Sequence, residues 1–235
     1  MSQHIPSVIL PEKFLLSKLS NTPIKETQDR YYASPKYNND DFVFQILPMK
    51  LMDNGITKPT HYMDTDIKRS FIKPQLDSTQ PNCIGTYNML QEVTTWFQSN
   101  YQTILGTDEV YLITPLIANS CCTLKFNLEY PTGKILTKCF ITKNKMREPI
   151  ENPTINDLQP HMRRGSTFQA LVHVEKIWFN KQIQEKTGLK LAGIKLTLLQ
   201  LEIIKEYQPR IPIQMKFSEY KMIDTETKKN EEIEI

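Results

Sequence analysis

Apolar and polar residues alternate along the segment 168–174, where every even-numbered position is apolar. A period of two is typical of a strand with one face in the core. Residues 190–204 are also rich in strand-forming side chains and are broken only by Gly193, which predicts a bulge or sharp bend in a curved sheet. The two segments therefore predict a pair of long strands joined by a polar connection.

A different period, of three to four residues, runs from residue 86 to residue 105. It predicts one amphipathic helix, with Thr86 as the N-cap and Gly106 as the C-terminal stop. The apolar face of this helix, which we expect to be core, consists of Tyr87, Leu90, Val93, Phe97, Tyr101 and Ile104.

Three further strands are predicted after the helix, at 110–117, 123–130 and 134–142. The last two are expected to form a hairpin through Pro131-Thr132-Gly133, with glycine where a positive φ is needed. A polar, proline-containing loop is expected over 143–165.

These elements predict a mainly β protein with one or more helices (α+β), built around a small curved barrel. Residues 1–85 are expected to be a loop-rich N-terminal extension packed on the core, with one strand at 41–52 in which Pro48 requires an edge position or a bulge. Residues 86–207 would hold the helix and the barrel, and 208–235 an edge segment and an acidic flexible tail.

Composition favours an intracellular protein. No run approaches the roughly 18 apolar residues of a membrane helix, and the first 16 residues are broken by prolines and charges, unlike a signal peptide. We expect the host cytoplasm or nucleus, or the virion if the protein is viral. The cysteines have no paired spacing, so neither a disulfide nor a zinc site is expected; they are Cys83, Cys121, Cys122 and Cys139.

Positive charge is concentrated in one part of the chain. The formal net charge is +3, but residues 121–195 carry 13 lysines and arginines against 6 acidic residues. Clustered cations are typical of a surface that binds phosphates. Lysines that merely solubilise the outer face of a sheet are the alternative.

Aromatic residues lie within the same basic region, and a single-stranded nucleic acid needs both cations for its phosphates and flat rings for its bases. Trp178, beside Lys176, is the sharpest candidate, with a core tryptophan that caps the barrel as the alternative. The candidate cations are Lys125, Lys134, Lys138, Lys143, Lys145, Arg147, Arg163, Arg164, Lys176, Lys190 and Lys195, and the candidate stacking platforms are Tyr130, Phe140, Trp178 and Phe179.

Motifs for catalysis are missing from the sequence. It has no glycine-rich phosphate loop, no nucleophile elbow and no His pair spaced for zinc. We therefore expect no enzyme, no cofactor and no metal. An enzyme whose site is assembled from distant residues stays open, because such sites leave no local pattern.

Two segments resemble a known family. Gly165-Ser166 followed by FQALVHVEKIWFN, and then GLKLAGIKLTLLQLEII, are similar to the C-terminal strand pair of OB-fold single-stranded-DNA-binding proteins of short-tailed phages and large DNA viruses. The residues that match in kind are Lys176, Trp178, Asn180, Gly188, Leu199, Gln200 and Leu201. The tail differs, since it contains two lysines and ends in Ile235, and the first 85 residues match nothing in that family.

The resemblance implies an OB-like Greek-key barrel that coats displaced single strands during DNA replication, recombination or repair, without catalysis. Single-stranded DNA is the expected partner, with RNA left open. The charge of the acidic tail suits docking of replication proteins or competition for the basic groove, and a tail that only solubilises the protein is the alternative. A viral structural or assembly protein with a β-sandwich is the alternative from another class.

Overall fold

The computed structural model describes residues 7–51, 55–57, 70–76, 79–129 and 132–206. Over these ranges, no helix combines the length and the apolar character needed to cross a membrane.

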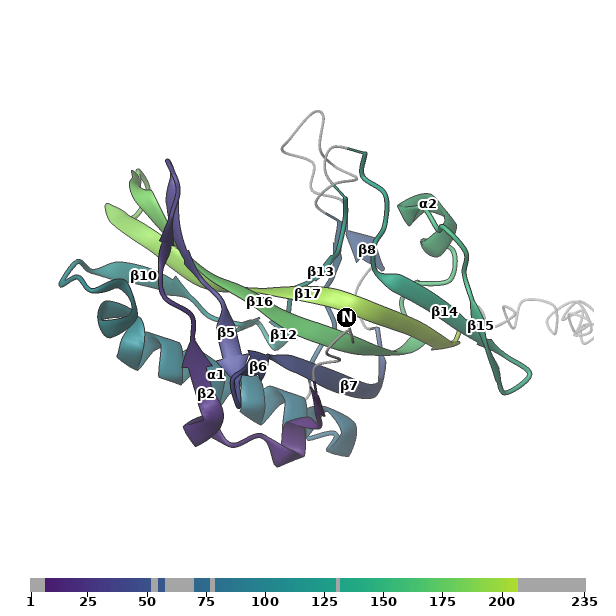
Figure 1. The fold of residues 1–235 in the computed structure, drawn as a ribbon. Coiled ribbons are helices and arrows are strands. Elements are labelled where there is room, and N and C mark those ends of the chain that lie inside the picture. The colour runs from purple at the N-terminus through teal and green to yellow at the C-terminus, as the bar shows by residue number, and fades with distance from the viewer. Residues whose placement is uncertain (1–6, 52–54, 58–69, 77–78, 130–131, 207–235) are drawn as a thin grey trace, which may run out of the picture.

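A long antiparallel hairpin forms the centre of the molecule (Figure 1). It consists of β16 (Thr167–Gln184) and β17 (Leu189–Lys205), and the turn between them contains Gly188 with a φ of 66°. The predicted pair of long strands is confirmed.

Other strands pair along the two edges of this hairpin. On the β16 side lie β4 (Arg30–Ala33) and β7 (Val43–Lys50), both antiparallel to it. Three strands run parallel to β17 in succession along its length: β10 (Tyr111–Thr114), β13 (Leu124–Phe126) and β14 (Lys138–Lys143).

Short strands complete the main sheet of 12 strands. These are β1 (Val8–Ile9), β3 (Lys25–Glu26), β8 (Ile56–Thr57), β9 (Phe71–Ile72) and β15 (Met146–Pro149). Two small sheets hold β11 (Ile117–Ala118) with β12 (Cys121–Cys122), and β2 (Leu19–Asn21) with β5 (Pro35–Tyr37) and β6 (Asp40–Asp41).

The described chain is thus mainly β with two α-helices, as the sequence predicts. The path of paired strands runs from β1 through β7, β16, β17, β13 and β9 to β8, and among the described residues it does not close on itself. An OB-like barrel is therefore not confirmed.

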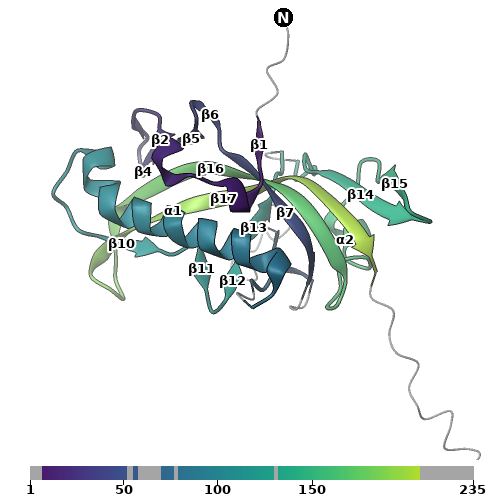
Figure 2. The same ribbon diagram turned by 90° about the horizontal axis from the view of Figure 1, so that it is seen from below.

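Helix α1 (Pro81–Leu105) covers one face of the sheet, as Figure 2 shows. The Phe97 ring meets the Phe179 ring of β16 with 5.6 Å between centroids, and both side chains are buried. Gly106 ends the helix in the left-handed conformation, as predicted. The helix begins at Pro81, so the N-cap prediction at Thr86 is wrong: Thr86 is a buried residue of the second turn.

The predicted hairpin of 123–130 with 134–142 is present, among the described residues, near its turn. Leu128 and Ile135 form an antiparallel bridge, the Leu136 N–H donates to the Asn127 carbonyl (2.7 Å), and Gly133 has the expected positive φ. Away from the turn the two segments separate: β13 and β14 each pair with β17, and β14 also pairs with β15 across a turn in which Asn144 and Lys145 both have positive φ. That geometry suits a tight hairpin turn, and asparagine tolerates it better than most residues.

The predicted loop over 143–165 contains two elements, β15 and the short helix α2 (Ile155–Leu158). Thr154 and Asp157 form a reciprocal capping box at the start of α2. This pairing satisfies backbone N–H groups that a helix as short as α2 could not satisfy by itself.

The first 85 residues contribute β1, β3, β4, β7, β8 and β9 to the main sheet. Pro48 lies in β7 where the register with β16 shifts, which confirms the bulge expected there. Two short 3₁₀ turns, Pro11–Lys13 and Leu16–Lys18, lie against α1. The domain boundaries stay a prediction, and the acidic tail falls outside the described residues.

Candidate nucleic-acid interface

A β-bulge at Glu175 exchanges the two faces of β16. Val174 pairs with Leu196 and Lys176 with Lys195, so Glu175 is an extra residue in its strand. Before it the even-numbered residues are buried, and after it Ile177 and Phe179 are buried. Because side chains alternate along a strand, the bulge brings the side chains of 176, 178 and 180 to the face opposite helix α1.

On that face lies a groove with a volume of about 430 Å³. Its lining includes four cations and three aromatic side chains, of which Phe126 is buried, and no acidic residue among those described. The lining residues are Arg30 and Tyr32 of β4; Lys176, Trp178 and Asn180 of β16; Lys195 of β17; and Ser70, Lys125, Phe126, Asn127 and Leu128. In Figure 1, β4 rises at one side of the β16–β17 hairpin and β13 at the other.

Lys176 and Lys195 stand directly opposite each other on paired strands, where like charges repel. The Glu175 carboxylate lies between them, 3.0 Å from the Lys176 Nζ and 2.6 Å from the Lys195 Nζ, and it also accepts a hydrogen bond from the Thr197 hydroxyl. Burial by itself raises the pKa of Glu175, but the hydrogen bonds from Lys195 and Thr197 and the lysine charges outweigh it and lower that pKa to about 2. Glu175 therefore stays ionised and holds both ammonium groups at the groove.

The Trp178 ring lies over Gly193, its partner on β17. A Cβ at position 193 would come within 2.8 Å of the Trp178 Cζ2 atom, closer than real Cβ contacts allow. The register with β16 runs through Gly193 without a shift, so the bulge that was one of the two predictions for Gly193 is wrong, while the sharp bend stays a prediction. The glycine is needed because only a residue without a side chain leaves room for the indole.

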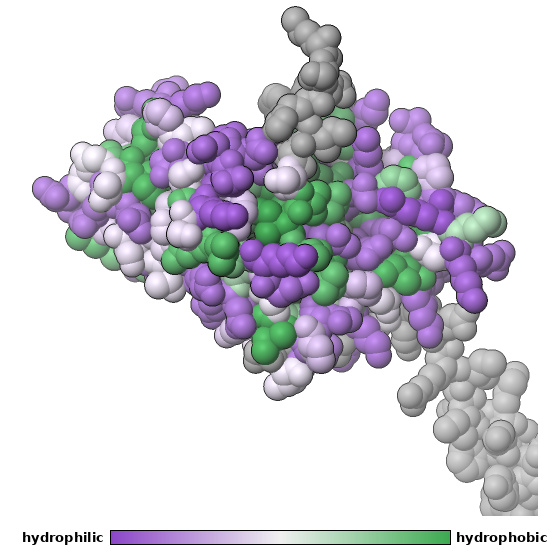
Figure 3. Space-filling view, turned by 60° about the horizontal axis from the view of Figure 1, so that its bottom comes forward, coloured by the Kyte–Doolittle hydropathy of each residue, from purple (hydrophilic) through white to green (hydrophobic). Residues whose placement is uncertain are grey.

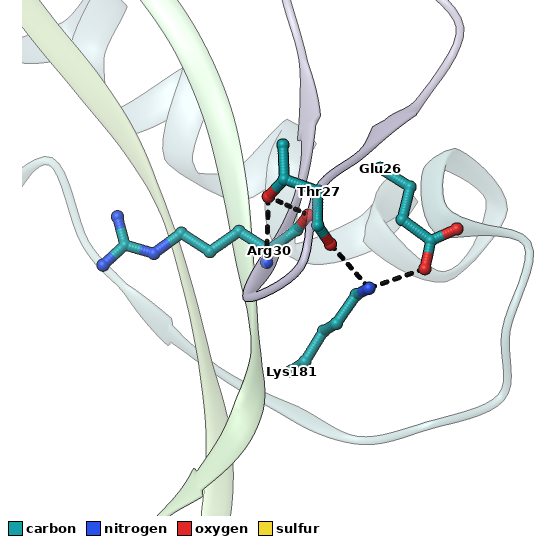
Figure 4. Close-up of polar contacts among 4 residues, drawn as sticks. All are labelled: Glu26, Thr27, Arg30 and Lys181. Atoms are coloured by element: carbon teal, nitrogen blue, oxygen red, sulfur yellow. Dashed lines mark hydrogen bonds and ion pairs between the residues drawn. The ribbon is translucent and has the colours of Figure 1, made fainter.

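Arg30 also approaches this indole, with its guanidinium carbon 5.8 Å from the ring centroid. Two hydrogen bonds with Thr27 fix the backbone of Arg30. The Arg30 N–H donates to the Thr27 hydroxyl (3.3 Å), and the Thr27 N–H donates to the Arg30 carbonyl (2.8 Å). The neighbouring cation, Lys181, is bound to Glu26 and the Thr27 carbonyl at 2.6 Å each (Figure 4). The Arg30 side chain extends away from that cluster and makes no ion pair with any described residue.

A second pair of arginine and aromatic ring lies at the other end of the sheet, on β14 and β15. The Arg147 guanidinium carbon is 3.6 Å from the Phe140 ring centroid, and the Arg147 Nε is 3.1 Å from a Glu202 carboxylate oxygen. Glu202 also accepts hydrogen bonds from Gln169 and Thr142. This arginine is occupied by contacts within the protein.

The structure gathers four of the predicted binding residues in the groove: Lys125, Lys176, Trp178 and Lys195. The remaining predicted residues lie elsewhere: Lys134, Lys138, Phe140, Lys143, Lys145 and Arg147 on or before the β14–β15 hairpin, Arg163 and Arg164 in the loop after α2, and Lys190 in an ion pair with Glu109. Tyr130 falls outside the described residues.

Phe179 requires a correction. Its side chain is fully buried and contacts Phe97 and Tyr111 edge to face, so it cannot offer a stacking surface to a base. The prediction failed because the bulge at Glu175 leaves no trace in the sequence, and without it Trp178 and Phe179 exchange faces.

The sequence did not reveal Arg30 and Tyr32 as groove residues. They lie in a segment read as irregular because of its prolines and polar residues. Arg30 and Tyr32 are a cation and a ring two residues apart, as Lys176 and Trp178 are in β16, and Tyr32 pairs directly with Trp178. That similarity of composition is the signal that was available.

Comparison with known proteins gives little guidance. No protein-family model matches the sequence, and no curated protein matches it. Among solved structures, gp2.5, a single-stranded DNA binding protein encoded by bacteriophage T7, aligns over 77% of this chain and 96% of its own, with 14% sequence identity and a TM-score of 0.36.

Proposed function

We propose that the protein binds single-stranded nucleic acid, with single-stranded DNA as the main ligand, in the groove around Trp178. The observation that carries this proposal is the placement of Trp178 and Tyr32 among four cations on one open face. Stacking on such a ring contributes about 1–3 kcal/mol per base and is tolerant of sequence. Neutralised phosphates add an affinity that weakens as salt rises.

Preference for single strands follows from the same geometry. In a duplex both faces of each base are covered by its neighbours, so Trp178 has no base face to contact unless the strands separate. The open groove also suits a chain that enters and leaves, rather than a small substrate enclosed on all sides.

The finer role is part of this proposal. A sequence-tolerant coat would protect displaced strands during replication, recombination or repair, and the acidic residues after 223 would dock other replication proteins. The proposal includes an OB-like use of the curved sheet, in which β16 and β17 would form the surface that meets the strand.

The test is fluorescence anisotropy with a labelled oligo-dT, in low and moderate salt, with unlabelled duplex DNA and RNA as competitors. We expect binding that weakens steeply with salt and that duplex competes poorly. RNA that competes as well as DNA would widen the ligand to both. No binding even in low salt would contradict the proposal.

A second function is favoured by the opposite face. Figure 3 shows apolar surface among polar side chains on the side turned forward there. On the 3₁₀ turns and α1, Leu15, Leu16 and Ile84 are exposed to 53%, 39% and 44%. An assembly protein would use such a face for contacts with other proteins. Light scattering that reports a monomer at every concentration would contradict self-assembly.

A further inference from the structure

The Asn180 side chain contains a buried amide oxygen that has no hydrogen-bond partner among the described residues. Asn180 is held in place by its backbone, which pairs with Arg30 of β4. Native proteins leave few buried polar atoms unsatisfied, because the group has lost water and gained nothing in return. The other such atom, Thr86 Oγ1, lies in the core under α1, whereas Asn180 lies at the groove.

Asn180 also lines a second hollow, with a volume of about 380 Å³, that adjoins the groove. Arg30, Tyr32 and Asn180 line both spaces. These three residues therefore form a ridge that a chain must cross when it passes from the Trp178 ring toward the tip of the long hairpin. The Asn180 amide oxygen is buried in the free protein and has no partner among the described residues, so a rotation of this side chain would present the oxygen to whatever crosses the ridge without breaking a hydrogen bond to that oxygen.

The hydrogen-bonding groups of the Asn180 carboxamide indicate which part of a nucleic acid it can bind. It offers one acceptor and two N–H donors, and either orientation of the amide leaves an unpaired atom beside the groove. A phosphate only accepts hydrogen bonds, so it cannot satisfy the amide oxygen. A base edge presents donors and acceptors side by side, and asparagine pairs with adenine in this way.

We propose that Asn180 binds the edge of an unpaired base adjacent to the base that stacks on Trp178. This inference rests on the proposed function and makes it more specific: the ligand is recognised through its bases as well as its phosphates. Phosphates or carboxylates by themselves are disfavoured as the group that Asn180 contacts, because neither donates a hydrogen bond to the amide oxygen.

The deciding variant is Asn180→Leu, which keeps the approximate shape and removes all hydrogen bonding. We expect affinity for oligo-dA and oligo-dC to fall about 3- to 10-fold, the effect of one lost hydrogen bond. An abasic oligonucleotide of the same length has the phosphates without the bases, and its affinity should change less than about twofold. Asn88→Leu, an exposed position on α1, is the matched control and should change neither affinity.

Thermal unfolding of the free protein separates a binding role from a structural one. Since the amide oxygen is unsatisfied in the free protein, its replacement by leucine should leave the melting temperature unchanged or raise it. A lower melting temperature with equal losses for normal and abasic strands would show a structural residue and overturn the inference. Unchanged affinity for every strand would also overturn it while leaving the proposed function intact, whereas failure of the unsubstituted protein to bind any single strand would refute both.

Discussion

The two ends of the sheet carry the same pair of side chains, an arginine beside an aromatic ring, in opposite states. At one end Arg147 lies flat on Phe140 and is tied to Glu202, which is further held by Gln169 and Thr142. At the other end Arg30 approaches Trp178 loosely and has no acidic partner among the described residues. A cation beside a ring is therefore not a binding site by itself. It can bind a ligand only where the cation and the ring face are not already occupied by other side chains of the protein.

The ring substitutions should separate the two ends most strongly. Trp178→Ala should weaken binding of oligo-dT roughly 5- to 140-fold, which corresponds to the loss of about 1–3 kcal/mol of stacking. Phe140→Ala should change that affinity less than about twofold and should instead lower the free energy of unfolding by about 1–2 kcal/mol, since its ring is half-buried under Arg147.

Anisotropy and urea unfolding on both variants check this contrast, with Trp178→Phe as the control that keeps a ring. A collapsed fold in Trp178→Ala would show a core tryptophan. Equal losses of DNA affinity in Trp178→Ala and Phe140→Ala would show that both ends bind.

Acid should act on stability through Glu175. Its pKa is lowered in the folded state to about 2 from an ordinary 4.5, so the stability it contributes is present above pH 4.5 and is lost as the pH falls toward 2. The full effect is on the order of 3 kcal/mol. Glu175→Gln should therefore flatten the decline of unfolding free energy below pH 4.5, as measured by urea unfolding at a series of pH values. An unchanged decline would place the acid sensitivity elsewhere.

Crowding at Gly193 offers a more local test. In Gly193→Ala the new Cβ would come within 2.8 Å of the Trp178 ring and should displace it. This displacement should lower both the stability and the DNA affinity. The loss of affinity should be smaller than in Trp178→Ala. In the Trp178→Ala background the same substitution should cost much less stability, because the crowded atom is gone. A double-mutant cycle measures the coupling, and additive effects would mean that the two residues do not meet.

The smallest contrast concerns the arginines. Arg30→Gln should reduce the slope of log affinity against log salt by roughly 0.7, the share of one phosphate contact with a single strand. Arg147→Gln should leave the slope unchanged, because its guanidinium is already paired with Glu202. Titrations at four or five salt concentrations check both, and equal slopes for the two variants would remove the distinction between the ends.

The sequence predicts features that depend on neighbouring residues better than features that depend on pairing between distant segments. The strand pair β16–β17 and the body of α1 were predictable because each carries its own hydrophobic period. Phe179 was misassigned because one extra residue at Glu175 reverses the faces, and composition does not record a bulge. Arg30 and Tyr32 were missed because their place beside Trp178 depends on pairing between segments about 150 residues apart in sequence.

The bulge at Glu175 has a consequence for how this chain can vary. The strand contributes to two hydrophobic clusters, Val172 and Val174 to the one that contains Leu90 of α1, and Ile177 and Phe179 to the one that contains Phe97, and the extra residue keeps all four side chains on the buried face. Deletion of that residue would turn Ile177 and Phe179 outward and drive Lys176 and Trp178 into the packing beneath α1. The fold should therefore tolerate substitutions at the groove positions of β16 better than the deletion of one residue from this strand. A substitution changes one side chain, whereas a deletion exchanges the buried and exposed faces of every residue after it.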